Sequence, residues 1–319
     1  MVRTIATSIA PRNLELQQDA IATWMKLGFD VISVNSGEEI NLIKEHFSGV
    51  KFVKADRNAL PISGKPYIYF DDILHVLEST GAQICGIVNS DIYLFADENL
   101  IDFIVKGARD GFVFGSRIDI SSLNSLIGEE YFKGFDYFFF SRDIIKTYLQ
   151  SDFCLGVPWW DYWAPLVPII KGFPVKQLIT PFAYHIQHPT RWSSKYYKYY
   201  GIKFLDYLMR EDILKHTGND LRAIIDANNK NLETSLLSIK LLGYINKKTT
   251  KLSYHDSSEL SCNKNISYQE YLKIRDELTY YKNRQKSFEK SFEELAVDFY
   301  SSWSWRITAP LRWIFEKLK

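Results

Sequence analysis

Hydrophobic positions in the first 115 residues alternate between short strand-like runs and longer helix-like stretches. The runs 4–9, Asp30–Asn35 and 50–55 are rich in β-branched residues, which favours strands. Between them, residues 13–27 and 38–47 carry apolar side chains at helical spacing. Strands separated by helices of this length predict βαβ units and a parallel sheet.

Asn13 is predicted to cap the first helix with its side chain. The alternation of strands and helices then continues along the chain. Further strands are expected at Ile84–Val88, 111–115, 135–141, Val175–Leu178 and Ala183–Ile186, and further helices at 69–79, 98–107, 143–149 and 159–171, the last with Pro158 in its first turn. We therefore expect an α/β fold with a mixed, mostly parallel sheet flanked by helices.

Beyond Lys203 the chain reads as mostly helical and polar. Ser267 and Glu270 form a capping box for a long helix over about residues 267–300. We expect a catalytic domain at residues 1–200 and a helical region at 201–319 that ends in an amphipathic tail, residues 303–319.

Composition narrows the class of protein. The apolar share of 46% and the charged share of 24% are ordinary globular values, and a net charge of +1 gives no general attraction to nucleic acid. Three widely spaced cysteines make neither a disulfide framework nor a metal knuckle. No signal-peptide core and no membrane-length apolar stretch is present, so we expect a cytoplasmic protein.

The strand Ile84–Val88 ends directly in Asn89, Ser90 and Asp91. Open α/β sheets bind ligands at the carboxyl ends of their strands, and carboxylate and amide oxygens suit a hard divalent cation. We predict that Asp91 contacts a cation that holds a diphosphate, and that Asn89 contacts the ribose or a metal-bound water. The alternative is that these residues only cap the next element.

An aspartate lies among indoles at the start of the helix 159–171. Asp161 is a candidate general base whose pKa the aromatic surroundings would raise, with Trp159, Trp160 and Trp163 stacking on the sugar rings of an acceptor. The alternative is that Asp161 only stabilises the helix N-terminus while the tryptophans fill the core.

Two histidines follow later in the chain, His185 on a predicted strand and His188 just beyond it. On a strand they do not share a face, so we do not expect joint ligands; one of them, preferably His188, would complete the metal shell begun by Asp91. Arg191 would pair with a phosphate oxygen. The alternative for either histidine is a hydrogen-bonded core residue.

Asp136 and the C-terminal segment 303–319 are two further candidates for binding. Asp136, in an aromatic strand, is a candidate for acceptor binding, or else an inward charge paired with a partner such as Arg142. The tail 303–319 mixes tryptophan with a net charge of +3, which suits the headgroup layer of a membrane or a docking helix. The basic, aromatic run 191–203 could extend that surface, and RNA binding is a weaker alternative because no RNP-like signature accompanies it.

Together these residues resemble GT-A glycosyltransferases of bacterial surface-polysaccharide assembly, such as O-antigen or capsule synthesis. The resemblance covers roughly residues 1–200 and also the closing segment 304–312. It implies that Asp91 is the metal-binding acid of an Asp-x-Asp motif, that Asp161 is the base of inverting members, and that a later histidine ligates the metal. Asn89 stands where many members carry aspartate.

The resemblance also implies an activity. A sugar would pass from a nucleotide-diphosphate sugar, a UDP-sugar, to a hydroxyl of a glycan or lipid-linked acceptor, in a single displacement assisted by Mg²⁺ or Mn²⁺. Ser8, Asn35 and Asp56 would bind the nucleotide, and the tail would contact the cytoplasmic face of the inner membrane.

Two other functions are kept as alternatives. A non-catalytic glycan-binding or scaffolding subunit of an assembly complex would use the aromatic surface for recognition. A sugar-phosphate nucleotidyltransferase shares the layered sheet but carries a glycine-rich loop after the first strand, where this chain has Ala10, Pro11 and Arg12.

Overall fold

The computed structural model describes residues 3–188, 194–229 and 233–254, which belong to one compact unit, Met1–Tyr254. The second unit, His255–Lys319, lies outside the described residues. The expected helix at 267–300, the tail 303–319 and Arg191 therefore fall outside the described part of the chain.

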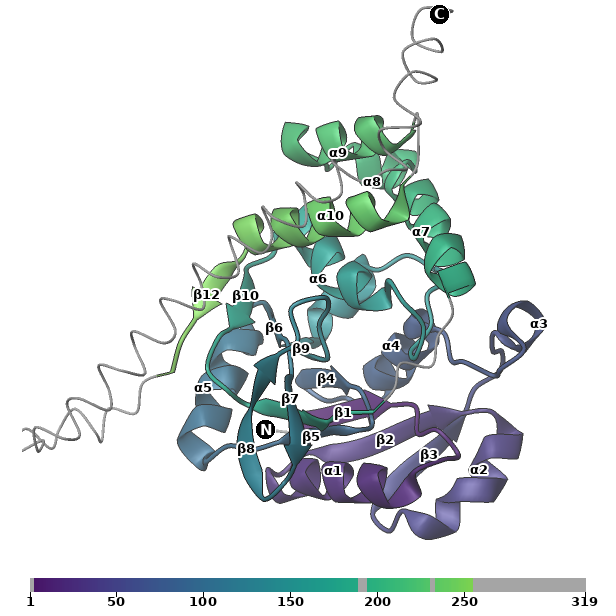
Figure 1. Ribbon diagram of the computed structural model, residues 1–319, viewed down its shortest axis with the longest axis vertical. Coiled ribbons are helices and arrows are strands. Elements are labelled where there is room, and N and C mark those ends of the chain that lie inside the picture. The colour runs from purple at the N-terminus through teal and green to yellow at the C-terminus, as the bar shows by residue number, and fades with distance from the viewer. Residues whose placement is uncertain (1–2, 189–193, 230–232, 255–319) are drawn as a thin grey trace, which may run out of the picture. The chain divides into compact units, whose positions relative to one another are not determined.

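A large sheet forms the centre of the first unit, with the strand order β12-β10-β6-β9-β4-β1-β2-β3 (Figure 1). Every neighbouring pair is parallel except the two that β9 makes, with β4 and with β6. The expected fold class is confirmed. The strands are β1 Arg3–Thr7, β2 Asp30–Asn35, β3 Val50–Lys54, β4 Ile84–Val88, β6 Phe112–Gly115, β9 Tyr137–Ser141, β10 Val175–Leu178 and β12 Thr250–Leu252.

A second, smaller sheet has the order β5-β11-β7-β8 and was mostly missed by the sequence pattern. Strand β11 runs antiparallel to β5 and parallel to β7, which forms a hairpin with β8. Only β11 was expected, because β5 has three residues and β8 is largely exposed, so neither shows a clear period. These strands are β5 Ile92–Leu94, β7 Ile118–Ser122, β8 Ser125–Glu130 and β11 Ala183–Ile186.

Helices cover both faces of the large sheet. Helices α1 and α5 bury apolar side chains in one core cluster, and α4, α6, α7, α9 and α10 contribute to the other. Burial of this apolar surface supplies the main stabilisation of the layers. The helices are α1 Leu14–Lys26, α2 Gly37–Ile43, α3 Leu60–Ser63, α4 Phe70–Ser79, α5 Glu98–Arg109, α6 Trp160–Ile170, α7 Ser194–Leu208, α8 Glu211–Leu214, α9 Asn219–Asn229 and α10 Thr234–Lys248.

Several local predictions need correction. Asn13 precedes α1, but its side chain makes no capping hydrogen bond. Its φ of 46° is left-handed, a conformation that asparagine tolerates better than most residues. The helix expected at 38–47 ends at Ile43 and continues as a 3₁₀ helix, Lys44–His46, and the one expected at 143–149 is a 3₁₀ helix, Arg142–Thr147. Pro158 precedes the first turn of α6 instead of lying in it.

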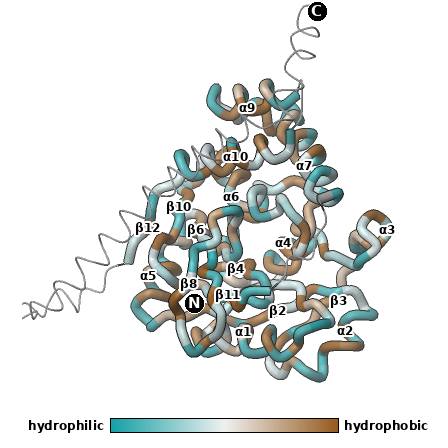
Figure 2. The backbone as a smooth tube through the Cα atoms, in the orientation of Figure 1, coloured by the Kyte–Doolittle hydropathy of each residue, from teal (hydrophilic) through white to brown (hydrophobic). Residues whose placement is uncertain are grey.

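The helices after residue 200 pack on the same core as the sheet. Hydropathy alternates along α9 and α10 (Figure 2), and the buried positions of α10, Leu237, Leu241 and Ile245, join the cluster that contains α6. A division at residue 200 stays a prediction. Among the helices of the described residues, none combines the length and hydrophobicity of a transmembrane span.

Candidate metal and acid–base site

The site lies at the carboxyl edge of the large sheet. Strands β1, β2, β4 and β6 all end at this edge, and the antiparallel β9 begins there. The backbone N–H of Asp136 donates to the carbonyl of Gly115, and that of Asn89 donates to the carbonyl of Asp136, at 3.1 and 3.2 Å. The polar residues that follow β4 and precede β9 are therefore neighbours in space.

Asp91, His185 and His188 converge on one point. The register of β5 and β11 pairs His185 with Ile92, the residue after Asp91. Oδ2 of Asp91 lies 3.2 Å from Nε2 of His188 and 3.7 Å from Nε2 of His185. One ligand atom from each residue lies within 4.8 Å of the others, a spacing that could hold a metal ion.

The expectation that the two histidines would lie on different faces is wrong. It assumed strand geometry for both, but His188 lies two residues beyond the end of β11. The chain there brings its ring centroid within 4.8 Å of that of His185, with the ring planes at 73°. Both imidazoles therefore face the same carboxylate.

The electrostatics of the three side chains favour an ionised aspartate. Burial opposes the charge on Asp91, but the hydrogen bonds with His185 and His188 outweigh it and lower the aspartate pKa below its usual range. Burial also opposes the charge on His185, and its hydrogen bonds to Asp119 and Asp91 nevertheless raise its pKa to about 9. The attraction between these groups holds the cluster together before any ligand binds.

A continuous polar network extends from His185 to Asp136. His185 Nδ1 lies 2.8 Å from Oδ1 of Asp119, which accepts a hydrogen bond from Arg117 Nε at 2.7 Å. Arg117 Nη1 donates to Oδ1 of Asp136 at 2.7 Å, and Asn89 Nδ2 donates to the same oxygen at 3.1 Å. The partner of Asp136 is thus Arg117 and not the arginine suggested by the sequence.

Asp161 lies in the first turn of α6 and reaches the same edge. Its Oδ2 accepts a hydrogen bond from the backbone N–H of Phe135 at 3.2 Å, next to Asp136 in the chain. Burial is the main cause that raises the pKa of Asp161 to about 7; the Phe135 N–H lowers it and the charge of Asp136 raises it further. A carboxyl group with a pKa near neutrality can exchange protons at physiological pH, as a general base must.

The three tryptophans around Asp161 are core residues. Trp159, Trp160 and Trp163 are 0%, 3% and 0% exposed. Trp160 packs on Phe138 and Trp163 on Phe204, with ring centroids 5.2 and 5.6 Å apart. Stacking of these indoles on an acceptor sugar is therefore ruled out by their burial, because α7 and β9 cover them.

The residues expected to bind the nucleotide lie at the ends of β1, β2 and β3. Asn35 is fully buried, and its Nδ2 donates to the carbonyl of Ile9 at 2.9 Å and reaches Ser8 Oγ at 3.4 Å. It therefore fixes the loop after β1. Asp56 is exposed beyond β3. Contact of Ser8, Asn35 and Asp56 with a nucleotide stays a prediction.

Gln17, a buried polar residue on α1, was not among the residues predicted from the sequence. Its Nε2 donates to the carbonyls of Ala10 and Arg12 at 2.9 and 2.6 Å. Its Oε1 accepts from the Ala10 N–H at 3.0 Å and from Ser90 Oγ at 2.7 Å. One side chain thus joins the loop after β1 to the Asn89-Ser90-Asp91 turn. A glutamine on the apolar face of α1 was the available signal.

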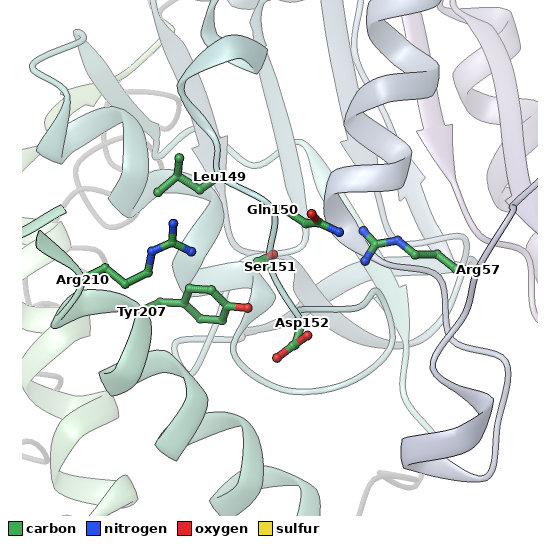
Figure 3. Close-up of a pocket in the computed structure, with 7 residues that line it drawn as sticks. All are labelled: Arg57, Leu149, Gln150, Ser151, Asp152, Tyr207 and Arg210. Atoms are coloured by element: carbon green, nitrogen blue, oxygen red, sulfur yellow. The ribbon is translucent and has the colours of Figure 1, made fainter. Parts of the chain in front are cut away.

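A separate cavity of about 360 Å³ lies elsewhere on the unit, with Arg57 and Arg210 on opposite sides of the segment 149–152 (Figure 3). Arg57 pairs with Asp71 and Asp72, and Arg210 pairs with Asp212, so neither arginine offers an uncompensated charge. None of the metal-site residues lines it. Its lining consists of Arg57, Leu149, Gln150, Ser151, Asp152, Tyr207 and Arg210.

No protein-family model and no curated protein sequence matches the chain. Similar solved structures include TarS of S. aureus in complex with UDP-GlcNAc, at 12% identity over 78% of this chain and 82% of that one, with a TM-score of 0.45.

Two further solved structures are similar to this chain. HddC from Yersinia pseudotuberculosis is 12% identical over 59% of this chain and 90% of that one, with a TM-score of 0.32. The 4-diphosphocytidyl-2C-methyl-D-erythritol synthase from Anaerococcus prevotii is 12% identical over 68% and 96%, with a TM-score of 0.37. At such identities and TM-scores we base the function on the site residues.

Proposed function

We propose that the protein transfers a sugar from a nucleotide-diphosphate sugar to a hydroxyl of a glycan or lipid-linked acceptor. The observation that carries the proposal is the convergence of Asp91, His185 and His188 at the carboxyl edge of the sheet. Asp161, with a pKa raised by burial to about 7, lies at the same edge. A cation site and a proton acceptor are the two parts that a displacement at a sugar diphosphate requires.

The donor set suits a divalent cation of borderline character. Two imidazoles and one carboxylate favour Mn²⁺ over Mg²⁺, because Mg²⁺ prefers oxygen ligands alone. Asp91, His185 and His188 would hold the cation, and the diphosphate of the donor would complete its ligands. When bound, the cation supplies positive charge that neutralises the departing diphosphate.

The residues of the chain supply the remaining steps. Asp161 accepts the proton of the acceptor hydroxyl on its carboxylate while the hydroxyl oxygen forms a bond to the anomeric carbon. The bond from that carbon to the diphosphate oxygen breaks, and the configuration inverts. The Phe135 N–H holds Oδ2 of Asp161 in place through this change, since it donates to that oxygen at 3.2 Å.

The test is a panel of sugar nucleotides with and without Mn²⁺. We expect a UDP-sugar to raise the melting temperature only when Mn²⁺ is present, and to release UDP slowly with water as acceptor. A nucleotidyltransferase would instead form a nucleoside triphosphate when pyrophosphate is added. A binding or scaffolding subunit would respond to none of the nucleotides, which would contradict the proposal.

Association of the tail with a membrane is proposed from the sequence alone, since residues 303–319 lie outside the described part of the chain. Deleting this segment is expected to move the protein from anionic liposomes to the supernatant. Unchanged partition would contradict membrane contact by the tail, and would leave the transfer reaction untouched.

A further inference from the structure

Trp159 has a backbone conformation that bulky residues rarely adopt. Its φ is 86° and its ψ is −23°, in the left-handed region. Among the described residues, Asn13 is the other non-glycine residue with a positive φ. Asparagine tolerates this region, whereas a tryptophan is strained there because its Cβ approaches the backbone. Such a conformation persists where the surrounding contacts impose it, and residues of this kind gather at functional sites.

Helix α7 supplies contacts that impose this conformation. The indole of Trp159 is fully buried, and its Nε1 donates to the carbonyl of Tyr197 at 2.8 Å. Its ring packs on those of Tyr197 and Phe204, with centroids 5.2 and 5.3 Å apart. A Cβ at Gly201 would lie 2.8 Å from Cζ2 of the indole, so α7 comes this close because Gly201 lacks one. The indole is therefore fixed against α7.

The strained residue lies where α6 begins, two residues before Asp161. The carbonyl of Trp159 accepts the N–H of Trp163 at 3.1 Å and so starts the hydrogen bonds of the helix. Asp161 is half-buried, and its Oδ2 accepts the N–H of Phe135 at 3.2 Å. A Cβ at Gly134 would overlap the same oxygen, which shows how closely the carboxylate lies against this backbone. A small rotation at the start of α6 would therefore displace it.

We propose that Trp159 is a positioning residue, whose left-handed backbone, held by the contacts with α7, sets the first turn of α6 and with it the place of the Asp161 carboxylate. The inference rests on the proposed function, in which Asp161 is the base, and adds α7 to the parts of the chain on which proton transfer depends. A role in filling the core does not explain the strained backbone. Trp160 and Trp163 are also buried on this helix, and neither has a positive φ.

The first test compares Trp159→Phe with Trp163→Phe on the UDP-sugar found active in the panel. Phenylalanine at position 159 loses the hydrogen bond to Tyr197 but keeps the cost of a positive φ, so the backbone should relax. We expect kcat to fall about 10- to 100-fold, while KM for the donor and Mn²⁺-dependent UDP binding are kept.

Trp163→Phe is the matched control. Trp163 is fully buried on the same helix, and its Nε1 has no hydrogen-bond partner among the described residues. This variant loses an indole from the same core and should keep the kcat of the wild type. Falls in kcat of equal size in the two variants would overturn the proposal.

A second pair of variants separates the backbone from the side chain. Trp159→Gly and Trp159→Ala remove the same indole, but glycine adopts a φ of 86° freely and alanine does not. Trp159→Gly should therefore have a kcat about tenfold higher than that of Trp159→Ala. Equal kcat values would contradict a role of the backbone conformation. If either variant does not fold, the comparison of the two phenylalanine variants decides.

The pH dependence of kcat/KM is a readout that loss of packing alone would not move. The titratable groups that face Asp161 are Asp136, Tyr131, Tyr162 and Tyr197, and Trp159→Phe keeps all of them. Burial is the main cause of the raised pKa of Asp161. A carboxylate displaced toward solvent should therefore make kcat/KM level off below about pH 7 in Trp159→Phe and not in Trp163→Phe.

An unchanged pH profile in Trp159→Phe would overturn the proposal. Failure of this inference stays distinct from failure of the proposed function, because Asp161→Asn tests the base itself. A large loss of kcat in Asp161→Asn together with wild-type kcat in Trp159→Phe would refute the positioning role alone.

Discussion

His185 and Asp119 are register partners on the neighbouring parallel strands β11 and β7, and Nδ1 of the imidazole lies 2.8 Å from Oδ1 of the carboxylate. This contact holds the ring so that its other nitrogen, Nε2, faces Asp91. Carboxylates in this position orient metal-binding histidines and raise their basicity. Asp119 therefore orients one of the three candidate metal ligands without being one of them.

Replacing Asp119 by asparagine should weaken Mn²⁺ binding by about 10- to 100-fold, because the amide holds the imidazole less firmly than the carboxylate does. Titration of the protein with Mn²⁺, followed by electron paramagnetic resonance, measures the change. Asp30→Asn is the matched control, since Asp30 is exposed at the amino end of β2, away from the site edge. Equal Mn²⁺ affinity of the Asp119 variant and the control would contradict this role.

The raised pKa of Asp161 predicts how transfer depends on pH. A base must be deprotonated to act, so kcat/KM should rise about tenfold per pH unit at acid pH and level off above about pH 7. Asp161→Asn should lower kcat by about a hundredfold to ten-thousandfold while Mn²⁺-dependent UDP binding is kept. A variant with wild-type kcat would show that another group is the base.

The same residue gives a prediction about stability. Because burial raises the pKa of Asp161 from 3.8 to about 7, the folded chain binds this proton more tightly than the unfolded chain does. The wild type should therefore lose stability relative to Asp161→Asn as the pH rises from about 4 to about 7, with no further change above. Urea unfolding midpoints of the two proteins at several pH values measure the difference, and a constant difference would contradict the raised pKa.

Replacing Gln17 should weaken binding of the donor and leave the chemical step nearly unchanged. Gln17→Leu leaves the N–H of Ala10 and the hydroxyl of Ser90 without their partner, so it should raise KM for the donor about tenfold and change kcat little. The free energy of unfolding should fall by about 1–3 kcal/mol. Gln18→Leu is the control, at a less buried position of the same helix, and should change neither KM nor the free energy of unfolding appreciably. A fall in kcat with unchanged KM would contradict a positioning role.

The sequence predicted the central parallel strands because they are apolar runs that end at turn residues. Asp30–Asn35, Ile84–Val88 and Val175–Leu178 have the bounds expected for them, and so does Ala183–Ile186 in the small sheet. The small sheet was missed apart from β11, because its other strands are short or largely exposed. Strands this short or this exposed show no local alternation of apolar and polar residues, so the sequence pattern does not reveal them.

The candidate site was predicted in part for the same reason. Asp91, His185 and His188 were identified from their local surroundings, but their convergence depends on the register between β5 and β11, which local pattern does not show. Asp119 and Gln17 act through partners 66 and 73 positions away. The burial of the tryptophans likewise depends on β9 and α7, whose packing on them no local pattern shows.

Binding of Mn²⁺ and UDP to the wild type and to Asp91→Asn, measured by calorimetry, tests most directly whether Asp91, His185 and His188 form a cation site for a diphosphate. Asparagine keeps the shape of the side chain and removes its charge. We predict that the wild type binds one Mn²⁺ and then UDP, and that Asp91→Asn binds neither at the same concentrations while remaining folded. Mn²⁺-dependent binding of UDP to Asp91→Asn with wild-type affinity would contradict the account.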